Sequence, residues 1–279
     1  MSVEEYRRQS LENWEAMAAG WERRADEIDA TCARMTEWLI AALAPKHGDV
    51  VLELAAGPGS VGLAASPLVG EGGRVIATDF SPAMVEVARR RADRLGVTNI
   101  EHAVMSADAL ELEDGSVDGA VCRFGFMLMP DPAAAFAETR RVLRPGGRLA
   151  FAVWRGPEQN PWVSIAGRML VERGVVPPPE PGAPGMFVLA DDERLRGVVE
   201  GAGFAIDRLE DVGADFRWDD IDDYVEVARE TGGQFGKAWD GASAEEQAAM
   251  KAELEERFEP FRVGDGYAMT GVAACVLAS

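Results

Sequence analysis

The chain has 279 residues, of which 47% are hydrophobic and 27% charged, and its formal net charge is −20. This size and composition predict one enlarged α/β domain or a core with a small cap, and the negative charge argues against nucleic acid and anionic membranes as partners. The three cysteines are far apart in the sequence, so neither a metal site nor a disulfide framework is predicted, and a cytoplasmic location is expected.

The N-terminal segment predicts two amphipathic helices. Residues 10–24 place Trp14 and Trp21 on one apolar face, and a second helix ends near Leu43, before Pro45. The first ten residues, MSVEEYRRQS, contain no apolar stretch, so we expect no signal peptide. No later apolar run reaches transmembrane length, and membrane insertion is not expected.

Residues 50–62, VVLELAAGPGSVG, predict a buried strand, a glycine-rich turn and the start of a helix. Gly57, Gly59 and Gly62 have the G-x-G-x-x-G spacing, and Asp79 follows at the end of a second strand, RVIATD. In a nucleotide-binding βαβ unit the glycines let the backbone approach the ligand, and the acidic residue binds the ribose hydroxyls. The order of these features therefore predicts a nucleotide site.

Glu53 indicates which kind of nucleotide is bound. Its carboxylate lies at the end of the first strand, four residues before Gly57. A pyrophosphate prefers helix N–H groups to a second negative charge, whereas an ammonium or sulfonium group suits a carboxylate. This position favours a ligand with a cationic group.

Strands and helices continue to alternate down the chain. Strands are predicted near 74–78, 100–104, 117–122 and 148–154, with helices near 60–68, 82–95 and 132–144, and this alternation predicts a parallel sheet. The basic run Arg89–Arg91 falls on one of these helices and is interpreted as a solvated face. After a Pro/Gly-rich loop at 177–185, we expect a helix at 191–202 and a strand at 204–218. A helical insert and a final strand then complete the chain.

Residues 53–59, ELAAGPG, resemble the E/D-x-G-x-G motif of class I S-adenosylmethionine (SAM) dependent methyltransferases, with Ala55 in place of the usual first glycine. The resemblance covers residues 45–155 closely and is nearest to the type 11 branch, which includes the quinone C-methyltransferases. It implies SAM as the cofactor. The cofactor contacts it implies are Glu53, Ala55, Gly57, Gly59, Asp79 on the ribose, Phe80, Met84 on the adenine, Asp108 and Ala109 at the adenine amino group, and Arg123.

The resemblance also implies a doubly wound, mostly parallel seven-stranded α/β sheet whose last strand is antiparallel, with helical cap elements. We expect an N-terminal helical cap at 1–44, a Rossmann-like SAM-binding core at 45–218, a helical lid insert at 219–262 and a final core strand at 263–279. In that layout the insert and the N-terminal helix cover the ligand edge.

The implied activity is methyl transfer to a small, apolar or aromatic acceptor, on oxygen or carbon. Trp21 is expected on the sulfonium, because aromatic faces attract cations. Trp14, Phe126 and Met127 are expected at the acceptor, and Tyr267 and Tyr224 are the candidates for deprotonating it. A small molecule is the expected partner, and a homodimer is compatible with the layout.

Two alternatives stay open. An NAD(P)-dependent oxidoreductase would use the same glycine turn and Asp79, although Glu53 disfavours it and no Tyr-x-x-x-Lys motif occurs. A catalytically inactive SAM-binding protein is the other alternative, for which the alanine at position 55 is the motif departure.

Overall fold

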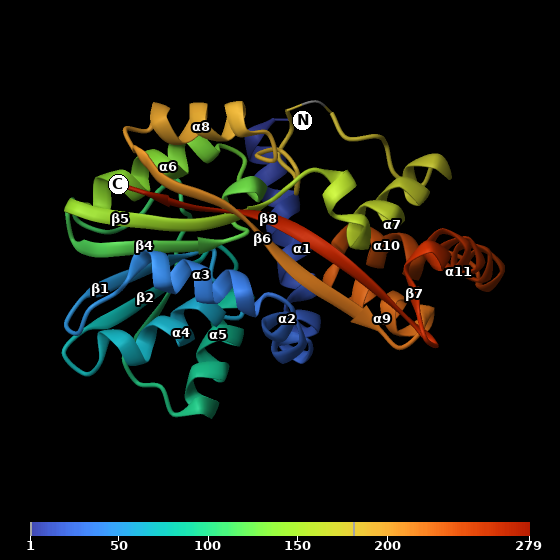
Figure 1. Ribbon diagram of the computed structural model, residues 1–279, viewed down its shortest axis with the longest axis horizontal. Helices are drawn as coiled ribbons and strands as arrows, with labels where there is room; N and C mark the ends of the chain where they lie inside the picture. The colour runs from blue at the N-terminus through green and yellow to red at the C-terminus, as the bar shows by residue number, and fades with distance from the viewer. Residues whose placement is uncertain (1, 181) are drawn as a thin grey trace.

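The computed structural model describes residues 2–180 and 182–279, so Pro181 in the expected loop lies outside the described residues. Strands and helices alternate through the first half of the chain (Figure 1). The strands are β1 (Val50–Leu54), β2 (Arg74–Asp79), β3 (Ile100–Val104), β4 (Val117–Arg123), β5 (Leu143–Trp154), β6 (Ile206–Trp218), β7 (Arg262–Val263) and β8 (Gly266–Ala278). The α-helices are α1 (Val3–Arg23), α2 (Ala25–Thr31), α3 (Ala33–Leu43), α4 (Ser60–Val69), α5 (Pro82–Leu95), α6 (Pro132–Val142), α7 (Pro161–Glu172), α8 (Asp192–Gly201), α9 (Ile221–Thr231), α10 (Gly233–Gly241) and α11 (Ala244–Phe258). Short 3₁₀ turns are η1 (Phe126–Leu128), η2 (Pro157–Gln159) and η3 (Glu259–Phe261).

One sheet organises the fold, with strand order β3-β2-β1-β4-β5-β8-β6 and the short β7 paired to β8. Neighbouring pairs from β3 to β5 are parallel, whereas β8 runs antiparallel between β5 and β6. The expected fold class is confirmed, including the position of the antiparallel last strand. Because the parallel strands end together, residues 54, 79 and 123 meet at one edge of the sheet.

Helices cover both faces of the sheet. Helices α6 and α8 lie on one side and α3, α4 and α5 on the other (Figure 1). Strand β3, at the edge of the sheet, has no buried residue, whereas all five residues of β1 and five of the seven residues of β4, at its centre, are buried. The burial of β1 and β4 is the pattern expected of parallel strands covered on both faces.

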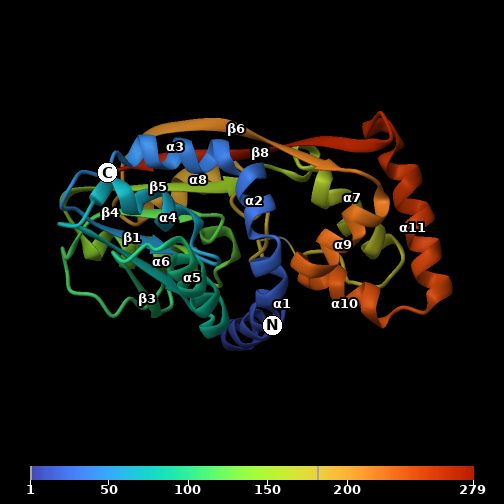
Figure 2. The ribbon, with the colours of Figure 1, turned by 90° about the horizontal axis from the view of Figure 1, so that it is seen from below.

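Strands β6 and β8 extend beyond the end of the neighbouring strand β5. Trp154, the last residue of β5, pairs with Ala273, which pairs in turn with Val212. The pairing of β6 with β8 continues for six more residues, to Trp218 and Tyr267. The two strands thus carry the insert, α9 to α11, beyond the ligand edge (Figures 1 and 2).

The insert has its own hydrophobic cluster. Buried residues of α9, α10 and α11 pack there with the outer ends of β6 and β8. Helix α7, a segment for which the sequence predicted no element, joins this second cluster through Ala166, Met169 and Leu170. The insert is therefore supported by a helix that precedes β6.

The N-terminal segment differs from the expectation in its helix boundaries. Helix α1 begins at Val3, because Ser2 and Glu5 form a capping box, and not at residue 10. The expected second helix is preceded by the separate short helix α2. Helix α1 lies between α5 of the core and α9 of the insert (Figure 2). Among the described residues, no helix combines the length and the apolar composition that crossing a membrane requires.

Candidate cofactor site

The turn between β1 and α4 contains three residues with left-handed backbone conformations. Their φ angles are 49° at Ala55, 51° at Gly57 and 79° at Gly59. Glycine adopts this region at no steric cost, whereas alanine is strained there. The backbone is left-handed at Ala55 as well, although the motif usually has a glycine at this position. Gly125 faces it closely, since a Cβ on Gly125 would lie 2.6 Å from the Ala55 Cβ.

Asp79 ties the second strand to this turn. Its Oδ2 accepts a hydrogen bond from the Gly57 N–H at 2.9 Å, and its Oδ1 accepts from the Ser81 N–H at 2.9 Å. The residue is 6% exposed. Burial raises the pKa of Asp79 to about 6, although the backbone donors oppose the shift. Asp79 therefore fixes the backbone of the turn, a role that motif spacing did not reveal.

Glu53 is buried at the end of β1 and is 2% exposed. Its Oε1 accepts from the Val61 N–H at 3.0 Å, at the start of α4, and its Oε2 has no hydrogen-bond partner among the described residues. Burial raises the pKa of Glu53 to about 7. Gly62 is required here, because a Cβ at that position would collide with Glu53 Oε2. The third glycine of the G-x-G-x-x-G spacing thus makes room for the carboxylate.

Asp108 lies after β3 and contacts helix α1. Its Oδ2 accepts from Arg7 Nη2 at 2.6 Å, and Ser106 Oγ hydrogen-bonds its Oδ1. Ala109 is exposed beside it and forms an isolated bridge with Ser106. The Arg7 contact was not predicted, because residues 101 positions apart carry no local signal of their pairing.

Arg123 ends β4 next to the turn. Its Nη1 donates to Thr36 Oγ1 at 2.8 Å and its Nη2 to Asp29 Oδ1 at 3.1 Å. Asp29 also accepts from Arg91. The interpretation of Arg89–Arg91 as a solvated face is therefore wrong for Arg91, which is 3% exposed, because α2 packs over that side of α5.

Trp14 and Trp21 pack against α5. Their ring centroids are 5.5 Å apart, and they cover a small cluster containing Met84, which is 1% exposed. Phe80 is half-buried just before that helix. Trp21 Nε1 also donates to the Thr231 backbone oxygen at 3.2 Å, which links α1 to the insert.

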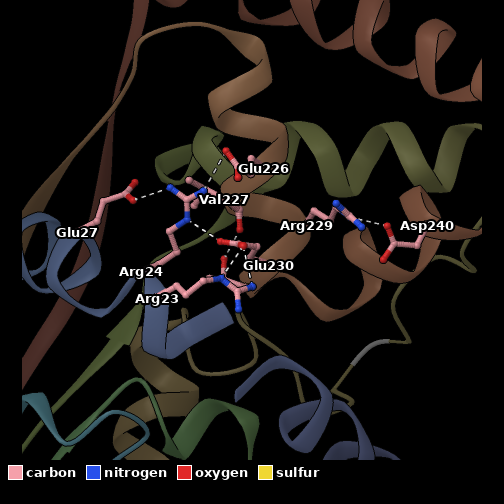
Figure 3. A network of polar contacts seen from close by, with 9 residues as sticks. Arg23, Arg24, Glu27, Glu226, Val227, Arg229, Glu230 and Asp240 are labelled. Atoms are coloured by element: carbon pink, nitrogen blue, oxygen red, sulfur yellow. Dashed lines mark hydrogen bonds and ion pairs between the residues drawn. The ribbon is translucent and has the colours of Figure 1, made fainter. Parts of the chain in front are cut away.

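Ion pairs strengthen the same link between α1 and α9 (Figure 3). Arg23 and Arg24 both donate to the Glu230 carboxylate at 2.7 Å. Gly20 permits the close approach of the helices, because a Cβ there would collide with the Glu230 backbone oxygen. The N-terminal helix and the insert therefore form one continuous wall beside the ligand edge.

The acceptor residues expected after β4 lie in the core. Phe126 is fully buried, with its ring stacked 3.9 Å from that of Phe136, and Met127 is 1% exposed. Phe124 follows directly after β4; its backbone has φ 67°, and its ring stacks on that of Trp154 with 4.1 Å between the centroids. The left-handed residue reverses the chain direction, so the residues after it turn inward.

A row of aromatic side chains leads away from Phe124. Trp154 contacts Trp162 at 5.3 Å, and Trp162 stacks on Phe216 at 4.2 Å between ring centroids. We call Phe124, Trp154, Trp162 and Phe216 the aromatic row. Three of the four are half-buried and Trp154 is buried. The row joins β4, β5, α7 and β6, so only the folded arrangement reveals it.

Tyr224 and Tyr267 lie in the second cluster, away from the turn. Burial raises the pKa of Tyr224, so its hydroxyl stays protonated near neutral pH and the phenolate that would act as a base does not form. Tyr267 is six residues along β8 from the level of Trp154, and its hydroxyl accepts from Arg262 at 2.9 Å. The structure does not bring either tyrosine to the sheet edge where Asp79 and Arg123 lie.

Comparisons with known proteins find relatives that are methyltransferases. The family described as "Methyltransferase domain" matches residues 51–147. The ubiquinone/menaquinone biosynthesis C-methyltransferase UbiE of Klebsiella pneumoniae is 30% identical over 169 residues, which are 57% of this chain and 67% of that protein. The UbiE of Pseudoalteromonas translucida is 38% identical over 122 residues, or 43% of this chain and 49% of that protein.

A solved structure has the same fold at lower identity. The crystal structure of a putative methyltransferase from Bacillus halodurans aligns with a TM-score of 0.61 at 22% identity, covering 87% of this chain and 97% of that one. The chain matches half or less of the length of several curated relatives. The glycine turn, the acidic residues at the ends of β1 and β2, and these relatives together show that the chain belongs to the class I SAM-dependent methyltransferases, in the branch of the UbiE-like C-methyltransferases.

Proposed function

We propose that this protein transfers the methyl group of SAM to a small, apolar or aromatic organic acceptor, by O- or C-methylation. The observation that carries the proposal is Glu53, a buried carboxylate with one oxygen unpartnered beside a left-handed glycine turn. A buried acid of this kind is costly unless a partner arrives. The ammonium and sulfonium groups of SAM are such partners, and a pyrophosphate is not.

The side chains fit the rest of the cofactor as well. Asp79 has two oxygens fixed by backbone donors, and each keeps a lone pair for a ribose hydroxyl. Asp108 offers a carboxylate at the end of the next strand, where the adenine amino group would be met. Membership of a SAM-dependent family sets aside the NAD(P)-dependent alternative.

When bound, SAM supplies a methyl group that is already activated by its positive sulfur. The protein's part is then to hold donor and acceptor in line and to exclude water. The wall formed by α1 and the insert, together with the aromatic row, serves both purposes. In this proposal residues 219–262 form a lid over the core of residues 45–218. Residues 1–44 form an N-terminal cap, and residues 263–279 supply the final strand of the core.

The aromatic row supports an acceptor with a planar ring. Its rings come from four elements that meet at the end of β4 and β5, and the UbiE-like relatives are named for quinone biosynthesis. Flat aromatic surfaces stack favourably on such side chains. We therefore place hydroxylated aromatic compounds first among acceptors. The net charge of −20 supports a protein with no nucleic acid partner, and the three scattered cysteines support a cytoplasmic location.

The test is a turnover assay. The protein is incubated with SAM and a panel of hydroxylated aromatic rings, aliphatic alcohols and amines, and S-adenosylhomocysteine and methylated product are measured by mass spectrometry. Turnover confined to aromatic acceptors is expected. Turnover of amines alone would contradict the acceptor class.

The second candidate is a SAM-binding protein without catalysis, suggested by Ala55. Tight binding of S-adenosylhomocysteine with no product from any acceptor would favour it over the enzyme. Trp162→Ala separates the two further, because it should reduce turnover and leave cofactor affinity unchanged.

A further inference from the structure

Helix α2, which precedes the Rossmann-like core, places one carboxylate between two buried guanidinium groups. Asp29 Oδ2 accepts from Arg91 Nη2 at 2.8 Å, and its Oδ1 accepts from Arg123 Nη2 at 3.1 Å. The two arginine side chains are only 4% and 9% exposed. Asp29 itself is 30% exposed at its side chain, so it lies at the margin of the buried region.

The same cluster holds the glycine turn. Arg91 Nη1 donates to the Pro58 backbone oxygen at 2.8 Å and to Ser60 Oγ at 3.3 Å. Arg123 Nη1 is fixed on the other side by Thr36 of α3. Turn, α2, α5 and the end of β4 are thus joined through Asp29.

Arg91 has two carboxylate partners in this cluster, whereas Arg123 has one among the described residues. Two nearly buried cations share Asp29, and the other carboxylate in reach, Asp26, is 86% exposed at its side chain and lies 3.3 Å from Arg91. The buried acid nearby, Glu53, feels Arg123 but makes no hydrogen bond to it among the described residues. Arg123 therefore shares its ion-pair partner with Arg91, and an incoming carboxylate would give Arg123 a partner of its own.

Arg123 has donors to spare for such a carboxylate. A guanidinium has five N–H groups, and the described residues take one bond from each of Nη1 and Nη2. The amino acid portion of SAM carries one α-carboxylate and one α-ammonium. The unpartnered Glu53 Oε2 and the spare donors of Arg123 are complementary to these two groups.

We infer that Asp29 is a positioning residue that holds Arg123 ready to receive the α-carboxylate of the cofactor, with Arg91 fixing Asp29 and the glycine turn together. This rests on the proposed function and adds to it a contribution from the N-terminal segment. Asp29 acts through Arg123, so its effect is confined to ligands that have the amino acid portion.

The experiment compares two ligands by titration calorimetry. S-adenosylhomocysteine has the amino acid portion, and 5′-methylthioadenosine lacks it. Asp29→Asn should weaken S-adenosylhomocysteine binding about tenfold and leave 5′-methylthioadenosine binding within about twofold. Arg123→Gln should show the same selectivity, Arg123→Lys should recover part of the affinity, and the double variant should be no weaker than Arg123→Gln alone.

Asp26→Asn is the matched control, since Asp26 is on the same helix and contacts the same Arg91 but is exposed. It should change neither affinity. The inference would be overturned if Asp29→Asn lost affinity equally for both ligands, or lost none. If Asp29→Asn does not fold, the same comparison of the two ligands is made with Arg123→Gln. If the unmodified protein binds neither S-adenosylhomocysteine nor SAM, the proposed function itself fails.

Discussion

Arg7 of α1 and Asp108 after β3 form an ion pair of 2.6 Å, with side chains 37% and 10% exposed. The pair joins the first turns of the N-terminal helix to the edge of the sheet where an adenine would lie. The helix therefore does more than cover the core. It contacts the carboxylate that would recognise the base.

Removal of Asp108 should weaken every ligand that contains adenine. In Asp108→Ala the amino group of the base loses its acceptor, which costs roughly 1.5–3 kcal/mol, or about ten- to a hundredfold in affinity. Calorimetry should show this loss for S-adenosylhomocysteine and 5′-methylthioadenosine alike. Asp114→Ala is the control, because Asp114 also pairs with an arginine but is 81% exposed. Unchanged 5′-methylthioadenosine binding would remove Asp108 from the site.

Replacement of Asp79 should lower both affinity and stability. An amide in Asp79→Asn cannot accept from both the Gly57 and the Ser81 N–H groups, so one buried donor is left unpaired as well as the ribose hydroxyls. We expect about ten- to a hundredfold weaker S-adenosylhomocysteine binding and a lower Tm. Asp131→Ala, which removes the acceptor of the Ala134 N–H at the start of α6, should lower the Tm alone. Full affinity in folded Asp79→Asn would count against the ribose role.

Cofactor affinity should rise with pH. Because the pKa is raised to about 7 for Glu53 and to about 6 for Asp79, both are largely protonated at about pH 5 in the free protein. The cations and hydroxyl donors of SAM favour the ionised forms, so binding releases protons and strengthens between about pH 5 and 8. Calorimetry in buffers of different ionisation enthalpy measures both effects. Glu53→Gln should flatten the profile, and an affinity that falls with pH would contradict the prediction.

The stability of the free protein should fall as the pH rises over the same range. Unfolded carboxyl groups ionise near pH 4, whereas these two folded groups ionise only at about 6 and 7. The folded state thus binds more protons in that window, and its free energy of unfolding falls as pH rises through it. Urea unfolding of the wild type and of Glu53→Gln isolates the contribution of Glu53. A difference between the two proteins that does not vary with pH would exclude it.

Loss of the Glu230 carboxylate should loosen the wall beside the site. Glu230→Gln removes the negative charge and one of the two oxygens that accept from Arg23 and Arg24 (Figure 3), a change of roughly 1–3 kcal/mol in local stability. Hydrogen exchange should become faster in α1, α9 and α10 and stay unchanged in β1 and β4. Asp240→Asn is the control, because its pair with Arg229 has both side chains more than half exposed. Identical exchange in both variants would show that packing alone holds α1 to the insert.

The core of the fold was predictable because its signals are local. The strand, turn and helix around residues 50–62 occupy the expected places, whereas the fifth strand begins at Leu143 and not near residue 148, so that Pro145–Gly147 lie within β5. Side-chain roles were less predictable wherever a distant element decides them. Arg89 and Arg91 look alike in sequence, yet only Arg91 is buried, because the helix turns it toward α2. The aromatic row and the Asp29 cluster depend on such distant contacts and have no motif.

The second hydrophobic cluster has a consequence for how this enzyme family diversifies. The recognisable family segment ends at residue 147, whereas α7, the insert and the outer halves of β6 and β8 all follow it and pack largely on one another. In the proposed function a change in those parts would act on the acceptor, and it would reach the cofactor groups through the contacts of α1 with the insert. We therefore expect acceptor preference to vary among related proteins more readily than cofactor use.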